Sequence, residues 1–357
     1  MKVLVGLSGG VDSAVVAYIL KRSGHEVIGA TMKVWDDNTD FGSSLKAKGC
    51  FSAHQEEDIA SARKIALALD IPYYVFDCSQ EYKKIVLSNF KSEYLAGRTP
   101  NPCVICNTSI KFDALPKTAK AQGLEFDKFA TGHYARVGYD IISKRFHLYR
   151  GLEKKRDQSY FLYRLTQEQL KDVIMPLGRY TKEETRTFAK SAGFEVANKK
   201  DSQDFYSGNI NDILKQDAKI GNFVTTDGKV LGHHEGIWHY TVGQRKGMGI
   251  AAERPLYVID IRPQTNEVVV GFEEEAGCNG VIADRLNWVS IPQIDKEMTI
   301  KAKVRSAQEP FKVCVKPLAN GQYQVDFLEP QKGVATGQSV VFYAKDMVLG
   351  GGLIVKS

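Results

Sequence analysis

The stretch "KVLVGLSGGVDS", Lys2 to Ser13, determines the fold expected for the first part of this chain. Its first half, "KVLVGL", is a compact apolar run rich in Val and Leu, which is typical of a strand buried in a parallel sheet. "SGGVDS" follows as a Gly-rich turn, and "VVAYILKRSG" has a helical periodicity that ends at Gly24. Strand, tight turn and helix in this order predict the opening unit of an α/β domain.

The same alternation continues beyond this unit. "EVIGATMKV" (26–34) reads as a second strand, "HQEEDIASARKIALALD" (54–70) as an amphipathic helix and "IPYYVFDC" (71–78) as a third strand. Strands that alternate with helices predict a doubly wound parallel sheet, with ligands beyond the carboxyl ends of its strands. Two more helices are expected to begin with capping boxes, Thr166 with Gln169 and Thr181 with Glu184.

Changes in composition and in hydrophobic pattern divide the chain into three parts. We assign residues 1–205 to the α/β domain and residues 206–278, which are rich in Gly and His, to a small central domain. Residues 279–357 consist of short alternating runs between turn residues, which predict a small antiparallel barrel or sandwich. A length of 357 residues agrees with two or three domains.

Composition favours a cytoplasmic protein. No apolar run approaches the length of a membrane span, and the first run reaches Gly9 and Gly10 too early for a secretory signal. The six cysteines are then expected to be reduced thiols rather than disulfides. A net charge of +6 is compatible with a polyanionic partner but is weak support by itself.

The Gly-rich turn has the features of a phosphate-binding loop. Ser8, Gly9 and Gly10 allow the backbone to turn its N–H groups toward an anion, and the helix that begins there adds the positive end of its dipole. Ser13 offers a hydroxyl donor, and Asp12 is a candidate ligand for Mg²⁺ on the phosphates. The loop lacks the Gly-Lys-Ser/Thr ending of a Walker A motif. The alternative is a turn of this composition that binds nothing.

"SGGVDS" resembles the loop of the PP-loop ATP pyrophosphatases, which have an adenine nucleotide hydrolase-like fold. "GATMKVWDD", "TPNPCVICNTSIKF", "ATGHYAR", "RDQSYFLYRL", "YTVGQRKGMGI" and "VVFYAKDMVLGGG" then occur in the order found in the bacterial tRNA-specific 2-thiouridylases. This resemblance runs through the whole chain and implies a C-terminal antiparallel β-barrel that binds tRNA. It also implies ATP-dependent 2-thiolation of the wobble uridine in the tRNAs for Lys, Glu and Gln.

In that family the 2-carbonyl oxygen is adenylated, and sulfur then attacks the carbon and releases AMP. The resemblance therefore implies ATP and Mg²⁺, tRNA, and a sulfur-donor protein, either a cysteine desulfurase or a relay carrier. It assigns ATP binding to Gly6, Leu7, Ser8, Gly9, Gly10, Val11, Asp12, Ser13, Met32 and Gly132. It assigns tRNA contacts to Asn101, Pro102, Cys103, His133, Arg156, Asp157, Gln158, Arg305, Ser306 and Gln338. It makes Cys106 catalytic, and we add Cys103 and Asp12 as candidate catalytic residues.

The cysteine segment departs from the family pattern. We expect Cys103 and Cys106 in a loop before a helix, and the family places a second reactive cysteine in a later "DSxxxCF" stretch. Here that stretch reads "DSQDFYSG", with Asp201, Ser202 and Gln203 in place but Tyr206 at the cysteine position. A phenol cannot carry a persulfide, so this chain departs from the two-cysteine mechanism that is usual in the family.

Three interpretations of the pair Cys103 and Cys106 remain open. Cys103 can act as the thiol partner of Cys106, or the two can be ligands of an iron–sulfur cluster with a third ligand such as Cys50. Structural zinc is disfavoured because no second CxxC or His pair has suitable spacing. We favour the thiol pair slightly over the cluster.

Two other functions compete with tRNA thiolation. One is a PP-loop synthetase that adenylates a small substrate, which would need neither the "NPCVICN" cysteines nor a separate C-terminal β-domain. The other is a tRNA-binding protein that has lost catalysis, which Tyr206 suggests. The intact "SGGVDS" loop and Cys106 argue against this second alternative.

Overall fold

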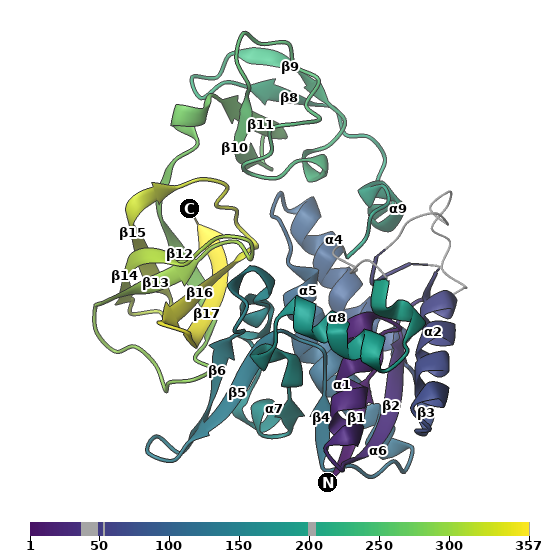
Figure 1. Ribbon diagram of the computed structural model, residues 1–357. Coiled ribbons are helices and arrows are strands. Elements are labelled where there is room, and N and C mark those ends of the chain that lie inside the picture. Colours follow the sequence, from purple (N-terminus) through teal and green to yellow (C-terminus); the bar gives the residue numbers. More distant parts are fainter. Residues whose placement is uncertain (37–48, 53, 199–204, 357) are drawn as a thin grey trace.

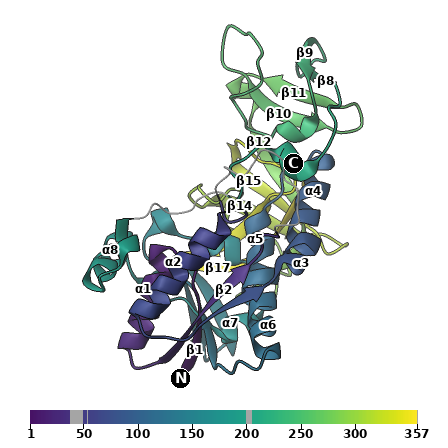
Figure 2. The ribbon, with the colours of Figure 1, turned by 90° about the vertical axis from the view of Figure 1, so that its right-hand side faces the viewer.

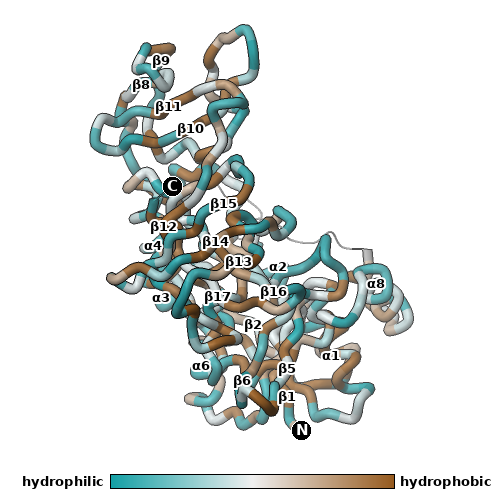
Figure 3. Tube along the Cα trace, turned by 90° about the vertical axis from the view of Figure 1, so that its left-hand side faces the viewer, coloured by the Kyte–Doolittle hydropathy of each residue, from teal (hydrophilic) through white to brown (hydrophobic). Residues whose placement is uncertain are grey.

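The computed structural model describes residues 1–36, 49–52, 54–198 and 205–356 (Figure 1). Its strands form three sheets, which correspond to an α/β region, a small central sheet and a C-terminal barrel. Hydrophobic segments along the chain are short and alternate with hydrophilic ones (Figure 3). In the described part of the chain, no helix is both long enough and apolar enough to span a membrane.

The α/β region contains a five-stranded parallel sheet, as predicted. The strand order is β3 (Tyr73–Asp77), β2 (Glu26–Lys33), β1 (Lys2–Gly6), β4 (Lys128–Ala130) and β7 (Val173–Ile174). The chain moves outward from β1 through β2 to β3, and then continues on the other side of β1 with β4 and β7. The order therefore reverses at β1, and the crevice at such a switch point is where open α/β sheets bind ligands.

Helices cover both faces of this sheet (Figure 2). Side chains alternate along β1, so Val3 and Val5 join one hydrophobic cluster and Leu4 joins another. The first cluster includes α1 (Val11–Arg22), α2 (Gln55–Ala68) and α8 (Lys182–Ser191). The second includes the helical run on the opposite face: α3 (Ser79–Tyr82), η2 (Lys83–Leu87), α4 (Ser88–Leu95), α5 (Pro102–Cys106), η3 (Asn107–Ala114) and α6 (Leu115–Ala121).

The cysteine segment is helical, so the prediction of a loop was wrong there. Pro102 occupies the first turn of α5, where its missing N–H costs nothing. The side chain of Asn101 caps the helix by accepting a hydrogen bond from the Val104 amide at 3.4 Å. Continuous helix then extends through the π-helical segment η3 into α6. Cys103 and Cys106 both lie in its first turns.

Both predicted capping boxes are present. Thr166 with Gln169 begins α7 (Gln167–Lys171), and Thr181 with Glu184 begins α8. Short 3-10 segments occur at η4 (Lys154–Arg156), η5 (Ser159–Leu162), η6 (Pro176–Arg179), η7 (Glu195–Asn198), η8 (Ile237–His239) and η9 (Glu273–Glu275).

The central sheet follows the short helix α9 (Ile210–Leu214). It has the order β10 (Tyr257–Arg262), β11 (Glu267–Gly271), β8 (Gly221–Val224) and β9 (Val230–His234). The pairing of β11 with β8 is parallel, and the other two pairings are antiparallel. Three side chains of its strands are fully buried: Val258 on β10, and Val268 and Val270 on β11.

The C-terminal strands close into an antiparallel barrel, which confirms the predicted fold. Its strands run in the order β12 (Cys278–Asn287), β15 (Tyr323–Gln331), β14 (Phe311–Pro317), β13 (Met298–Lys303), β16 (Ser339–Ala344) and β17 (Met347–Lys356), and β12 also pairs with β17. Alternate residues such as Ala302, Val313 and Val325 fill the interior. Two strands from the first sequence segment, β5 (Ala135–Asp140) and β6 (Arg145–Arg150), extend this sheet through β17.

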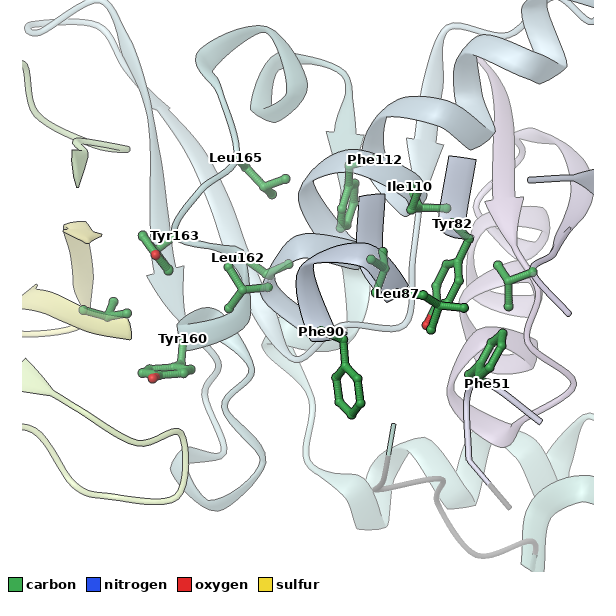
Figure 4. Close-up of a cluster of buried hydrophobic side chains, with 14 of the residues drawn as sticks. Phe51, Tyr82, Leu87, Phe90, Ile110, Phe112, Tyr160, Leu162, Tyr163 and Leu165 are labelled. Atoms are coloured by element: carbon green, nitrogen blue, oxygen red, sulfur yellow. The ribbon is translucent and has the colours of Figure 1, made fainter. Parts of the chain in front are cut away.

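A continuous hydrophobic cluster joins the α/β region to the barrel (Figure 4). The hydroxyl of Tyr160 donates to the Ser339 carbonyl at 2.8 Å, and the Tyr163 hydroxyl lies 3.1 Å from Ser339 Oγ. A Cβ added to Gly351 would lie 2.8 Å from the Tyr163 ring. The barrel therefore packs directly against the α/β region rather than being linked to it only through the chain.

Candidate functional site

A cavity of about 460 Å³ lies at the carboxyl ends of β1, β2 and β4, at the switch point of the sheet. Its wall includes predicted ATP-binding residues: Gly6, Leu7, Ser8, Gly10, Val11, Asp12, Ser13, Met32 and Gly132. Its wall also includes three predicted tRNA-binding residues: His133, Arg156 and Gln158. The fold therefore brings together residues from two sets that are widely separated in the sequence.

Hydrogen bonds of Ser8 and Ser13 hold the turn of the Gly-rich loop. Ser13 Oγ accepts a hydrogen bond from the Ser8 amide at 3.1 Å and donates one to the Gly10 carbonyl at 3.1 Å. Gly9 has a φ of +70°, and a Cβ there would lie 2.4 Å from the Asp58 carbonyl oxygen, so only glycine fits. Gly10 precedes α1 without supplying a side-chain cap, so the first amides of α1 have no side-chain acceptor at the positive end of the helix dipole, where an anion is favoured.

Asp12 is held by two partners that the sequence did not reveal. Lys182 Nζ donates to both carboxylate oxygens of Asp12 at 2.8 and 2.9 Å, and the Tyr134 hydroxyl donates to one of them at 3.0 Å. Lys182 begins α8 and is only 6% exposed. A buried lysine that is paired with Asp12 of the Gly-rich loop is a functional candidate. Its only sequence signal was its place directly after the capping residue Thr181.

The segment after β4 forms the opposite wall. A Cβ on Gly132 would lie 3.0 Å from Asp12 Cβ and 3.1 Å from the Ser13 amide, so glycine allows this wall to approach the loop. His133 is buried against the Phe112 ring, and its Nδ1 lies 2.8 Å from Thr131 Oγ1. Burial, assisted by the charge of Lys111, lowers the pKa of His133 well below its usual value. The imidazole is therefore neutral at physiological pH.

Met32 reaches the cavity because Gln55 holds the end of β2. The Gln55 side chain accepts hydrogen bonds from the Val34 and Trp35 amides at 2.8 and 2.9 Å. It also donates to the Met32 carbonyl at 3.2 Å. The predicted nucleotide contact of Met32 thus depends on a glutamine at the start of α2.

The cysteine helix leads to the same cavity. Lys111 and Leu115, farther along this continuous helix, line the cavity, as does Cys50. Cys103 and Cys106 are half-buried and are not among the described residues of the cavity wall. Burial raises the pKa of Cys106 to about 12; Lys111 lowers it in part, while Cys50 and Cys103 raise it further. In this conformation the Cys106 thiol is protonated and shielded.

The described residues do not support a metal centre at the cysteines. No group of three or more His, Cys, Asp and Glu side chains within residues 1–36, 49–52, 54–198 and 205–356 is arranged to hold a metal ion. Cys50, the suggested third cluster ligand, is exposed at the cavity. The iron–sulfur interpretation therefore gains no geometric support here.

Tyr206 occupies the expected position of the second reactive cysteine. Its hydroxyl donates to an Asp212 carboxylate oxygen at 3.0 Å, and its ring packs against the same hydrophobic cluster as Cys106. The preceding Phe205 carbonyl accepts from the Phe51 amide at 3.1 Å, next to Cys50 in the chain. The expected Asp201, Ser202 and Gln203 lie outside the described residues.

Asp157 differs from its neighbours in the predicted tRNA-contacting loop. Arg156 and Gln158 line the cavity, whereas the Asp157 carboxylate is fully buried. Arg150 Nε donates to it at 2.9 Å, and the Gly151 and Ser159 amides donate at 3.2 and 3.0 Å. Asp157 therefore offers no surface to RNA in this conformation, and it fixes the loop that presents the other two side chains.

The three barrel residues that were predicted to contact tRNA make hydrogen bonds within the protein. Arg305 donates to the Gly333 carbonyl at 2.8 Å and to the Val242 carbonyl at 3.3 Å, which joins the barrel to the central domain. The Ser306 carbonyl accepts from Lys303 at 3.3 Å. The Gln338 side chain is 7% exposed and donates to backbone oxygens just before the cysteine helix.

Three family models match the chain in succession. They are described as the tRNA methyl transferase HUP domain (residues 1–206), the tRNA methyl transferase PRC-barrel domain (209–272) and the aminomethyltransferase beta-barrel domain (278–354). Full-length relatives, in contrast, are named for thiolation.

Proteins named "tRNA-specific 2-thiouridylase MnmA" are similar to this chain along its whole length. The one from Endomicrobium trichonymphae is 49% identical, with 99% of each chain covered. The one from Acetivibrio thermocellus is 46% identical, again with 99% of each covered. The one from Clostridium botulinum (strain Eklund 17B / Type B) is 46% identical and covers 99% of this chain and 97% of its own. The chain belongs to the family of tRNA-specific 2-thiouridylases.

Proposed function

We propose that this protein catalyses the ATP-dependent 2-thiolation of the wobble uridine in the tRNAs for Lys, Glu and Gln. The observation that carries this proposal is the cavity wall, which combines the phosphate loop with Lys111 of the helix that bears Cys103 and Cys106. A small-molecule synthetase has no need for a thiol-bearing helix at its nucleotide site. The names of the full-length relatives support the same activity.

The residues of the loop suit ATP as the first substrate. The amides at the start of α1 and the Ser13 hydroxyl would hold phosphate oxygens, and Met32 and Gly132 line the rest of the cavity. Lys182 lies directly beside Asp12 and adds positive charge close to this site. Asp12 has oxygen atoms of the kind that Mg²⁺ prefers. When bound to the phosphates, Mg²⁺ would neutralise charge that develops on the departing pyrophosphate.

In the first chemical step, the uracil 2-carbonyl oxygen attacks the α-phosphorus of ATP. The bond from that phosphorus to the bridging oxygen of the β-phosphate breaks, and pyrophosphate leaves. The proton lost from uracil N3 passes to solvent, because an imidazole whose pKa lies well below its usual value, as that of His133 does, is a poor proton acceptor. The target base must leave the anticodon stack to reach the cavity.

In the second step, the sulfur arrives as a persulfide on Cys106, loaded by a cysteine desulfurase or a relay carrier. The terminal sulfur attacks C2 of the adenylated base, the C2–O bond breaks, and AMP leaves. The Cys103 thiolate then attacks the Cys106 sulfur, which releases the thiolated base and forms a Cys103–Cys106 disulfide. A cellular thiol reductant restores the pair. Reduced thiols and a tRNA substrate both support a cytoplasmic location for this reaction.

The test uses the full chain, ATP labelled at the α-phosphate, and unmodified transcripts of the three tRNAs. We expect tRNA-dependent release of pyrophosphate and, with a sulfide source or a desulfurase, 2-thiouridine at the wobble position in nucleoside mass spectra. A transcript with cytidine at the wobble position is the control. Pyrophosphate release that needs no tRNA would indicate a small-molecule synthetase, and tRNA binding without release would indicate an inactive tRNA-binding protein.

A further inference from the structure

A second cavity, of about 600 Å³, opens on the outer face of the barrel where β13, β14 and β16 meet the end of β6. We call it the barrel groove. Its charged lining residues are Arg150, Lys301, Lys312 and Lys345, opposed by a single acid, Glu309. None of the five was predicted to bind anything. The groove is therefore a concave surface with an excess of positive charge.

The sheet register places two of these lysines side by side. Lys301 on β13 is paired directly with Lys312 on β14, and on its other side with Tyr343 on β16. Like charges in directly opposed positions destabilise a sheet. Both lysines are exposed, and within the described residues no carboxylate lies within 4 Å of either ammonium group. This arrangement becomes favourable when an anion lies between them.

A neighbouring lysine shows that this excess is specific to the groove. Lys316 lies on the same strand as Lys312, four residues farther along, and therefore on the same face. Its ammonium is 3.3 Å from Asp326 and 3.6 Å from Glu297. The barrel thus neutralises the lysine outside the groove and leaves the two inside it uncompensated.

The floor of the groove holds two buried cations and one buried acid. The buried Asp157 carboxylate accepts from Arg150 at 2.9 Å and lies 3.7 Å from Lys303. Arg150 also lies 3.3 Å from Glu309, and both Arg150 and Lys303 lie over the Tyr343 ring. Two buried cations therefore share one buried acid, and Glu309 at the rim adds a negative charge next to Arg150.

The floor connects the groove to the candidate active site. Asp157, which holds Arg150, lies between Arg156 and Gln158, and these two line the nucleotide cavity. A ligand that bears phosphates at several positions can contact both regions, whereas a single small anion cannot. Interfaces with nucleic acids are, moreover, richer in positive charge than those with proteins.

We propose that the barrel groove binds the phosphodiester backbone of the tRNA substrate, away from the target base, through Lys301 and Lys312. This proposal rests on the proposed function. Contacts of this kind position the nucleic acid without reading its sequence, and they make affinity fall with salt concentration. The groove would thus add affinity and orientation to the adenylation site rather than chemistry.

The experiment compares the full chain with Lys301→Gln, Lys312→Gln and the double variant. Affinity for an unmodified tRNA transcript is measured by fluorescence anisotropy between 50 and 300 mM KCl. We expect the double variant to bind roughly tenfold more weakly at low salt, and its plot of log K against log salt to be shallower by about two, one for each lost phosphate contact. ATP affinity should not change. Lys312→Arg should retain most of the affinity.

Lys316→Gln on the same strand is the matched control and should retain the slope of the unaltered protein. A double variant that folds, as judged by circular dichroism, but has unaltered affinity and slope would overturn the proposal. Normal tRNA binding with loss only of sulfur transfer from a donor protein would also overturn it, in favour of an acidic protein partner. Failure of the proposed function would appear differently, as absence of tRNA-dependent pyrophosphate release by the unaltered protein.

Discussion

The side-chain amide of Gln338 in the barrel donates a hydrogen bond to the backbone carbonyl of Pro100, at 2.9 Å, immediately before the cap of the cysteine helix. It donates a second one to Thr99 at 3.1 Å, and the Thr99 amide in turn donates to the Thr336 carbonyl at 2.8 Å. A residue expected to touch tRNA is thus directed inward. It connects the position of the barrel to that of the helix that bears Cys103 and Cys106.

Gln338→Ala should reduce thiolation more than it reduces tRNA affinity. The change leaves two buried carbonyls without their donor, which costs about 1–3 kcal/mol and loosens the start of the cysteine helix. We expect the rate of thiolation at saturating tRNA to fall, with the Kd for tRNA changed less than about threefold. Gln331→Ala, elsewhere in the barrel, is the control. A large loss of tRNA affinity at an unchanged saturating rate would instead support direct contact with RNA.

Lys182→Ala should impair adenylation. The substitution removes a charge beside the phosphate loop, and loss of such an electrostatic group typically reduces turnover by about a hundredfold. It also leaves Asp12 without its charged hydrogen bonds, so we expect the free energy of unfolding to decrease by about 1–3 kcal/mol. The measurement is tRNA-dependent pyrophosphate release at saturating ATP. Lys190→Ala, exposed on the same helix, should behave as the parent protein. If Lys182→Ala releases pyrophosphate at the rate of the parent protein, Lys182 has no role in adenylation.

Cys106→Ser should abolish thiolation when a desulfurase supplies the sulfur, but it should leave pyrophosphate release intact, because ATP chemistry requires no thiol. Cys103→Ser should also fail when a desulfurase supplies sulfur, since the disulfide that releases the product cannot form. Free sulfide can attack the adenylated base directly, so both variants should retain some activity with sulfide. Cys314→Ser, in the barrel, is the control. Full desulfurase-dependent activity of Cys103→Ser would exclude the thiol pair.

Alkylation of Cys106 should depend steeply on pH. Its raised pKa of about 12 keeps the thiol protonated at neutral pH, so labelling by iodoacetamide should increase about tenfold per unit between pH 7 and 10. Peptide mass spectrometry can follow this residue separately. Rapid labelling of Cys106 at pH 7 in the free protein would contradict the shielded state. Acceleration at pH 7 by ATP and tRNA together would show that substrates open the site.

The same burial has a consequence for stability. The raised pKa values of Cys78 and Cys106, each about 12, mean that the unfolded chain loses these protons at lower pH than the folded one. The two protonated thiols therefore make their full contribution to the free energy of unfolding below about pH 9. This contribution decreases as the pH rises toward 12, because the folded chain must then lose the same protons from buried sites. Urea denaturation at pH 8 and pH 10 measures this decrease, and it should be smaller in Cys78→Ser. An equal decrease in the parent protein and in Cys78→Ser would show that groups other than Cys78 cause the loss of stability.

Much of the fold follows from local patterns in the sequence. The apolar run of β1, the Gly-rich turn after it and the capping boxes at Thr166 and Thr181 are each specified by residues within a few positions of one another. Short-range rules of this kind also predicted the alternating strands of the barrel. They failed at the cysteine segment, where Asn101 and Pro102 start a helix whose signal was read as a loop.

The candidate phosphate-binding loop and the two cysteines could likewise be recognised in the sequence, because each is a short motif whose expected chemistry follows from its residue types. Tertiary packing alone decided what lies beside them. Lys182 reaches Asp12 across 170 positions, and Gln338 reaches Pro100 across 238. Strand pairing between β6 and β17 set Arg150 beneath the barrel groove, and the register of β13 with β14 set Lys301 against Lys312. Such contacts depend on how whole helices and strands pack and on the register of the strands, which no local pattern of residues specifies. The same packing buries His133 and Cys106, and this burial keeps the imidazole and the thiol uncharged.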